Sequence, residues 1–361
     1  ATEGSAAKIF AGGKGATAVV TGNPTAVLNK TDDKTLTVTE IYGGGDAAEV
    51  TGNTAVTLTK GTVTNAFGGG NAAAINGNTT VSIASATASN VYGGGNLAGV
   101  TQTATINMTG GNVTTGLYGG CNTSGIVTGN IAVNVTNGTI GTDAEHEANV
   151  HGGGYGKNTA TEGNVTVTIA QGEGKSVNIW GDVYGGSALG NVNDAATDQT
   201  KVQLDNGTIH GCLYGGGLGA KNGVDGATAD IAALVNGTVN VIVNGGTVTE
   251  QVFGCNNVNG TPKSNVTVTI NGTNAHTPAS GTEGQPGYTP AVYAISEVYG
   301  GGNMAHYAPA GSEVCKVIVN NCESSIGYVY GGGNAANVTS TDVTINGGII
   351  GQVFGGGHGN K

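Results

Sequence analysis

The sequence contains no arginine, and all 12 of its basic residues are lysines. Arginine is the usual residue for recognising phosphate groups, and the formal net charge of −11 repels nucleic acids and anionic lipid surfaces. We therefore expect no nucleic-acid partner. The sequence also lacks any run approaching the roughly 20 apolar residues of a membrane-spanning helix, so we expect no membrane insertion.

Charged residues make up only 10% of the chain, and tryptophan occurs once. Glycine, by contrast, accounts for 70 of the 361 residues, against a usual share of about 7%. Valine and isoleucine recur throughout, which argues against a disordered chain. Because no window has the 3.6-residue periodicity of an amphipathic helix, the composition favours a glycine-rich β-structure.

A repeated motif, an aromatic residue followed by glycines, organises the sequence. The early copies lie 25, 25 and 26 residues apart, and insertions stretch the middle ones. Phe10 and His151 occupy the aromatic position in two degenerate copies, giving about 12 copies in all. The regular copies contain Tyr42, Phe67, Tyr92, Tyr118, Tyr184, Tyr214, Phe253, Tyr299, Tyr330 and Phe354.

Apolar residues alternate with polar ones at fixed offsets within each repeat. This period of two predicts short strands whose inward residues include Val56, Leu58, Val81, Ile83, Val343 and Ile345. A 25-residue unit cannot bury its apolar face alone, but units stacked about 4.8 Å apart in register can do so. We therefore predict an all-β protein, a parallel β-solenoid (β-helix) of about 12 rungs of about 25 residues, with three short strands per rung.

We expect one β-solenoid domain over residues 1–361, with loop insertions in the middle rungs. These insertions fall at about 141–150, 156–163, 172–182, 191–200, 220–230 and 272–293. The glycine triplets are expected at corners where backbones crowd and positive φ angles are needed. The polar residues that follow the triplets should form a side-chain ladder: Asp46, Asn71, Asn96, Asn122, Asn303 and Asn334.

The repeats resemble those of a known group of proteins. The segments NVYGGGN (90–96), GNTTVSI (77–83) and YVYGGGNAANVTSTDVTINGGIIGQVFGGG (328–357) are similar to the VYGGGN repeats of large Gly/Thr/Asn-rich, adhesin-like surface proteins of anaerobic gut bacteria. The resemblance extends from Ile41 to the C-terminus. It implies a secreted β-solenoid located outside the cell or on the bacterial cell surface, and it carries over no catalytic residues.

The orientation of the aromatic column is the main open question for assembly. Polar residues two positions before the ring, such as Glu40 and Glu297, should point outward, and strict alternation then directs the ring outward as well. Outward rings would form an exposed apolar stripe that serves as an assembly surface. The alternative is a corner that turns the rings inward to stack in the core.

Candidate catalytic and metal-binding groups are few. Glu40, Asp182 and Glu297 belong to distant rungs and make no pair, so we predict no enzymatic activity and no catalytic residues. The densest set of possible metal ligands lies in or beside an inserted loop, where a solvated loop is favoured over a zinc site. These residues are Asp143, Glu145, His146, Glu147 and His151. We expect no cofactor, although incidental calcium binding remains open.

Five cysteines leave at least one unpaired. A bridge between Cys315 and Cys322 across one corner is conceivable. The favoured interpretation is that the cysteines serve as small buried residues.

Three classes of function remain. Neither end shows the pattern of a helical cap, so the end rungs either belong to a longer chain or stack on the next copy, with segment 8–20 against segment 343–354. We favour a non-enzymatic fibre or adhesin subunit that associates with itself head to tail. The alternative is a protein that binds glycans, or less plausibly cleaves them, through loops around Tyr155, Trp180 and Tyr288. An ice-binding face ranks last because the outward column is too mixed.

Overall fold

The computed structural model describes residues 3–30, 34–309 and 311–359, and within them the regular structure consists of β-strands. One set of strands ends at the aromatic position: β1 (Glu3–Phe10), β4 (Thr35–Tyr42), β7 (Thr62–Phe67), β9 (Thr87–Tyr92), β10 (Ala104–Tyr118), β13 (Asn149–His151), β17 (Val183–Tyr184), β21 (Leu213–Tyr214), β23 (Thr247–Phe253), β25 (Ile295–Tyr299), β27 (Ser325–Tyr330) and β29 (Ile349–Phe354).

A second set is rich in valine, isoleucine and threonine: β3 (Thr25–Asn29), β6 (Thr54–Lys60), β8 (Thr79–Ile83), β12 (Ile131–Ile140), β15 (Val165–Ala170), β16 (Val177–Ile179), β19 (Gln199–Asn206), β20 (Thr208–Ile209), β22 (Thr238–Val243), β24 (Val266–Ile270), β26 (Cys315–Val319) and β28 (Thr341–Ile345). The remaining strands are short pieces beside the glycine corners: β2 (Val20–Thr21), β5 (Val50–Thr51), β11 (Ser124–Val127), β14 (Asn158–Thr161) and β18 (Asn191–Val192).

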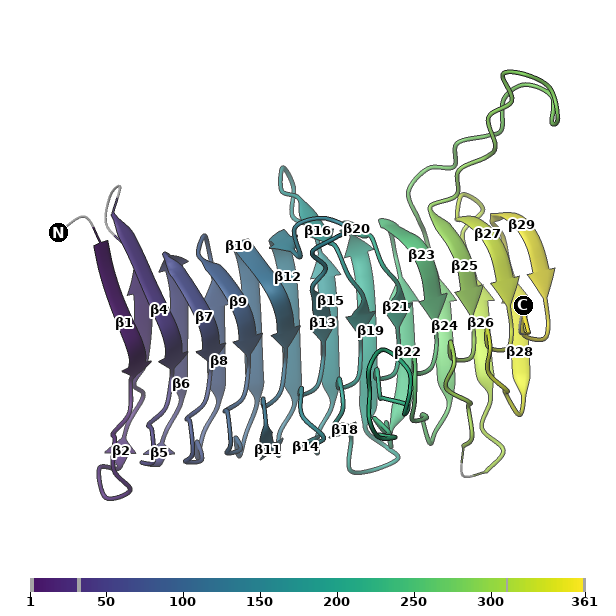
Figure 1. The fold of residues 1–361 in the computed structure, drawn as a ribbon. Coiled ribbons are helices and arrows are strands. Elements are labelled where there is room, and N and C mark those ends of the chain that lie inside the picture. Colours follow the sequence, from purple (N-terminus) through teal and green to yellow (C-terminus); the bar gives the residue numbers. More distant parts are fainter. Residues whose placement is uncertain (1–2, 31–33, 310, 360–361) are drawn as a thin grey trace.

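The strands of the first two sets form one 24-stranded sheet, and every pairing between named strands is parallel. Each strand pairs with its equivalent in the next repeat, so that Val56 faces Val81 and Leu58 faces Ile83. Successive strands follow one another along a single axis, from β1 at one end to β29 at the other (Figure 1). The predicted all-β, parallel arrangement is confirmed, and it is solenoid-like.

The interior is a continuous column of stacked apolar side chains. Val56, Leu58, Val81 and Ile83 are fully buried, as the alternation predicts. Two further inward predictions, Val343 and Ile345, lie in the same columns but are only partly covered, and Ile345 is 40% exposed. The reason is that they belong to β28, which has a paired strand on one side only among the described residues.

The glycine triplets stand at crowded corners. A Cβ atom placed on Gly44 would lie 2.8 Å from the backbone of Gly70, closer than any side chain tolerates. Gly43, Gly44 and Gly45 do not have positive φ angles, so that part of the prediction is wrong for this triplet. Close approach between successive corners, rather than a left-handed backbone, explains glycine at these positions.

The insertions leave the sheet along two opposite edges. The loop around 141–148 and the long arm, residues 272–293, project beyond one end of the strands, whereas the loop around 220–230 lies at the glycine-corner end (Figure 1). The long arm is a twisted hairpin with antiparallel bridges between Thr277 and Val292 and between Ser280 and Thr289.

Candidate functional site

The aromatic residues of successive repeats form one continuous stack. Neighbouring rings lie nearly parallel, with centroids between 4.5 and 5.2 Å apart. The stack contains Phe10, Tyr42, Phe67, Tyr92, Tyr118, His151, Tyr184, Tyr214, Phe253, Tyr299, Tyr330 and Phe354. The imidazole of His151 therefore takes the place of a phenyl ring.

The prediction that these rings form an exposed stripe is wrong. Tyr42 is fully buried, and even Tyr118 is only 7% exposed. The rings still form clusters separate from the main apolar core, as strand alternation requires. They are buried because each ring covers the next and because residues after the glycine corners, including Ala188, Leu189 and Leu218, pack against the stack. Phe354, in the last strand, is the exposed ring at one end of the stack.

Several phenol groups of the stack are anchored by carboxylates two residues earlier. The hydroxyl of Tyr42 donates to Glu40 at 3.0 Å, and that of Tyr184 donates to Asp182 at 2.7 Å. Burial raises the pKa of Tyr42 and of Tyr184, so both remain protonated donors. Burial also raises the pKa of Asp182, whose other oxygen accepts the backbone N–H of Cys212 at 2.8 Å. The two phenol–carboxylate bonds hold each ring beside the residue two positions before it, and the Cys212–Asp182 bond links adjacent repeats.

The candidate metal ligands do not come together. Nδ1 of His146 lies 2.8 Å from a carboxylate oxygen of Asp143 in an exposed contact, while His151 is buried in the aromatic stack. Burial lowers the pKa of His151 to about 3, and its Nδ1 has no hydrogen-bond partner among the described residues. Across the described part of the chain, no group of three or more His, Cys, Asp or Glu residues could hold a metal ion.

The polar residues after the glycine triplets form the predicted side-chain ladder, in two runs. In the first run the amide groups of Asn71, Asn96 and Asn122 each donate to the preceding member, starting from Asp46, at 2.7–2.9 Å. The second run joins Asn257, Asn303, Asn334 and His358 at 2.9–3.1 Å. Backbone hydrogen bonds place Tyr155, Ala188 and Leu218 at the equivalent position in the repeats between.

A small apolar pocket of about 210 Å³ lies where the ladder is interrupted. Its walls come from four successive repeats, one of which contributes the loop at 220–230, and they include Tyr155, Leu189, Leu218, Val224, Asp225 and Val258. The ring of Tyr155 is 45% exposed and meets Tyr118 edge to face. Apart from Tyr155, the pocket residues were not predicted. The sequence does mark the site, because three consecutive repeats lack the asparagine that follows the glycine corner elsewhere.

The three aromatic residues predicted to contact glycans are not gathered in this pocket. Trp180 stacks on His210 with ring centroids 3.6 Å apart, and Tyr288 belongs to the long arm. The long arm and the strands beside Trp180 lie toward the edge opposite the glycine corners (Figure 1). Tyr155 follows β13 at the glycine-corner edge and is the only one of the three that lines the pocket.

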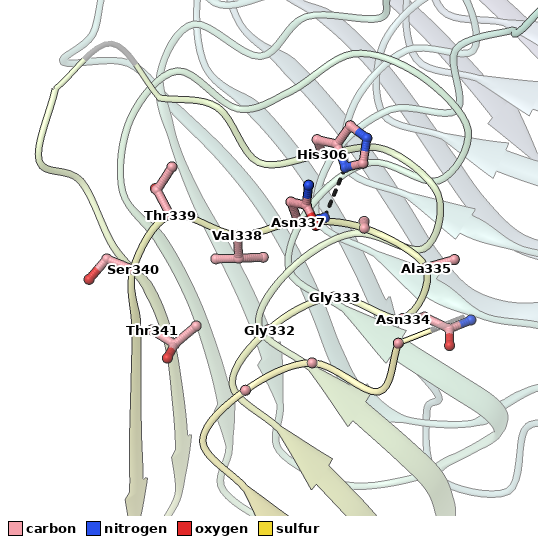
Figure 2. A pocket seen from close by; sticks show the side chains of 14 residues that line it. His306, Gly332, Gly333, Asn334, Ala335, Asn337, Val338, Thr339, Ser340 and Thr341 are labelled. Atoms are coloured by element: carbon pink, nitrogen blue, oxygen red, sulfur yellow. Dashed lines mark hydrogen bonds between the residues drawn. The ribbon is translucent and has the colours of Figure 1, made fainter. Parts of the chain in front are cut away.

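A surface hollow lies at the C-terminal end of the sheet. It has a volume of about 700 Å³ and is lined by the last glycine corners and by the segment from Asn334 to Thr341. Figure 2 shows His306, Asn337 and Thr341 around the hollow beside Gly332 and Gly333. Nδ1 of His306 accepts the backbone N–H of Asn337 at 2.8 Å. In earlier repeats, the corresponding corner contacts the glycine corner of the next repeat.

The strands beside this hollow present apolar side chains at an open edge. Within the described residues, β28 and β29 pair only with the preceding repeat. Four of their side chains are 40–45% exposed: Ile345, Ile349, Val353 and Phe354. At the other end, β1 pairs with β4 and with no other strand in the part of the chain that the structure describes.

Within the described residues, the structure has no helix long and apolar enough to span a bilayer. Comparison of the chain with known proteins finds no matching family model, no matching curated protein and no matching solved structure.

Proposed function

We propose that this protein is a non-enzymatic structural subunit of an extracellular or cell-surface fibre or adhesin, built as a solenoid of about 12 three-stranded rungs. In this proposal, copies associate head to tail, so that β29 of one copy pairs with β1 of the next. The observation that carries the proposal is the open edge formed by β28 and β29, with its half-exposed apolar side chains. No nucleic-acid or membrane partner is proposed, since the chain has no arginine and a net charge of −11.

The backbone groups of the two edges are complementary. The N–H of Gly331 donates to the carbonyl of Phe354, so the peptide groups of Phe354 face the preceding repeat. Successive residues of a parallel strand face alternate neighbours, and the groups of Val353 therefore face the open edge. Directly after β1, the N–H of Ala11 donates to the carbonyl of Tyr42, so the peptide groups of Ala11 face the repeat of β4. The peptide groups of the preceding residue, Phe10, therefore face the open edge of β1.

The side-chain columns are complementary as well. The register of the sheet places Ala6, Ile9 and Phe10 in the columns that end at Ile350, Val353 and Phe354. Pairing of β1 with β29 would continue the aromatic stack and cover the exposed apolar side chains. The corner of the second copy, starting at Ala11, would enter the hollow lined by Gly332 and Gly333.

The test is the state of association of the purified chain. Sedimentation velocity over a range of concentrations and negative-stain microscopy should show filaments whose width is that of one molecule. Val353→Pro removes the open-edge N–H without removing an internal ladder bond, and it should leave folded monomers by circular dichroism. Val353→Thr keeps the N–H and serves as the matched control that still assembles.

A mixing experiment tests the direction of association. Val353→Pro keeps an intact N-terminal edge, so it should bind to the C-terminal end of a growing wild-type filament and stop its growth. Small amounts of the variant should therefore shorten wild-type filaments. A wild-type chain that stays monomeric at high concentration, or copies that meet only side to side, would exclude the proposal.

A second candidate function, glycan binding, is favoured by one observation. The pocket beside Tyr155 combines a half-exposed tyrosine ring with apolar walls and the carboxylate-bearing residue Asp225. Such a site suits the apolar face of a sugar ring, with hydroxyl groups directed at the carboxylate. Binding of labelled polysaccharide should be lost in Tyr155→Ala and retained in Tyr288→Ala, whose side chain lies outside the pocket.

A further inference from the structure

Two buried cysteines from adjacent repeats face each other inside the sheet. The Sγ atoms of Cys255 and Cys315 lie 3.7 Å apart, and both residues are fully buried. Cys255 follows Phe253 at the corner position that is glycine in repeats such as those of Gly44 and Gly69. Cys315 stands in the inward column beside Val266. The nearest sulfur to Cys315 thus belongs to Cys255, which replaces Cys322 as its candidate partner.

We propose that Cys255 and Cys315 form an intrachain disulfide. A disulfide bond is about 2.05 Å long, so the two sulfurs must approach by roughly 1.6 Å, a movement within reach of side-chain rotation. The two residues are 60 positions apart in the chain. The bridge would therefore tie together the repeats on either side of the long arm, which departs between β24 and β25.

The bond would form by two thiol–disulfide exchanges with a small disulfide such as oxidised glutathione. The thiolate of one cysteine attacks the reagent, forms a mixed disulfide and releases one glutathione thiolate. The second cysteine then attacks the protein sulfur of this mixed disulfide and releases the second glutathione. Two protein thiols are oxidised, one small disulfide is reduced, and the two thiol protons pass to the released thiolates.

The timing of this reaction follows from burial. Burial raises the pKa of the Cys255 thiol, and neither sulfur is accessible in the folded chain. Exchange should therefore occur while the chain folds, before β26 closes over the corner. An exported protein folds in surroundings where such small disulfides are available.

The other three cysteines have different surroundings. The sulfur of Cys121 lies 3.5 Å from the carbonyl oxygen of Ala98, and that of Cys212 lies 3.2 Å from a carboxylate oxygen of Glu250. Cys322 is exposed. They provide an internal reference, because each should remain a free thiol.

The test counts thiols after refolding the full chain with a mixture of oxidised and reduced glutathione. Blocking and titration in denaturant without reductant should reveal three of the five thiols, and peptide mapping should recover the pair Cys255–Cys315. Five titrating thiols, or a bridge that includes Cys322, would overturn the proposal. Because the count is made on unfolded single chains, the result does not depend on filament formation.

Two variants supply matched controls. Cys255→Gly and Cys315→Val restore residues found at the same positions in neighbouring repeats, so both should fold. Each should show four free thiols whether or not reductant was present. The wild-type chain should melt several degrees higher when oxidised than when reduced, and neither variant should show this difference. An equal response of the variants to reductant would also overturn the proposal.

Discussion

The imidazole of His151 lies parallel to the ring of Tyr184, with centroids 4.6 Å apart. Burial of this histidine in the aromatic stack keeps it neutral, since its pKa falls from an ordinary value of 6.5 to about 3. Protonation of His151 is therefore less favourable in the folded chain than in the unfolded chain. The contribution of the neutral His151 side chain to the free energy of unfolding is fully present above pH 6.5 and is lost as the pH falls from 6.5 toward 3.

The first prediction follows from this linkage. Lowering the pH from 7.5 to 5 should reduce the free energy of unfolding by about 2 kcal/mol through His151 alone. His151→Phe should remove this contribution, because phenylalanine occupies the same position at Phe67 and Phe253 without titrating. Urea unfolding of both chains at the two pH values gives the comparison. An equal loss of stability in both chains would contradict the prediction.

The second prediction concerns the apolar column. Ile83 is fully buried between Leu58 and Met108, so Ile83→Ala should reduce the free energy of unfolding by about 2–5 kcal/mol. Hydrogen exchange should accelerate first in β6 and β10, because each repeat contacts mainly its neighbours. Ser82→Ala, on the outward side of the same strand, should change stability by less than about 0.5 kcal/mol. Uniform destabilisation of distant repeats would be inconsistent with this account.

The third prediction concerns the asparagine ladder. Asn96 donates to Asn71 and accepts from Asn122, both at 2.9 Å, and Asn96→Ala interrupts both bonds. We expect a loss of about 1–3 kcal/mol in the free energy of unfolding, measured with denaturant. Asn112→Ala is the matched control, because Asn112 is exposed and its side chain makes no hydrogen bond to the described residues. Equal effects of the two substitutions would show that the asparagine ladder contributes nothing to the free energy of unfolding.

The fourth prediction concerns the joint between copies. The proposed joint pairs backbone edges and apolar columns, and Lys8 is already paired with Glu40 of its own chain at 2.6 Å. Filament length should therefore change little between 50 mM and 500 mM sodium chloride, judged by light scattering and microscopy. Dissolution of the filaments at the higher salt concentration would indicate a charged interface and contradict this joint.

The sequence was sufficient to predict the columns of the sheet. Residues such as Val56 and Val81 share an offset from the aromatic residue, and a period of two fixes the side of the strand on which each lies. The asparagine ladder follows from the same offsets. The alternation of side chains along each strand also placed the aromatic rings outside the main core, but it did not predict that Tyr42 and its neighbours are buried there.

Contacts between residues of repeats that are separated by insertions could not be predicted from the sequence. Tyr155 and Leu218 line the same pocket because insertions of different length leave the glycine corners in register, and spacing along the chain conceals this. The proximity of Cys255 to Cys315 could not be predicted for the same reason. Cys322 is near in sequence but exposed, whereas Cys255 lies 60 positions away and faces Cys315 across one step of the ladder.

The strands lie crosswise to the long axis of the sheet, so the hydrogen bonds between repeats run along that axis (Figure 1). Tension applied at the two ends would open these bonds in peeling geometry, one repeat at a time, rather than loading many of them together in shear. Each 25-residue repeat that peels away releases roughly 80–90 Å of chain. A tether made of this protein would yield by short, separate extensions and recoil by refolding against the next intact repeat, which acts as its template.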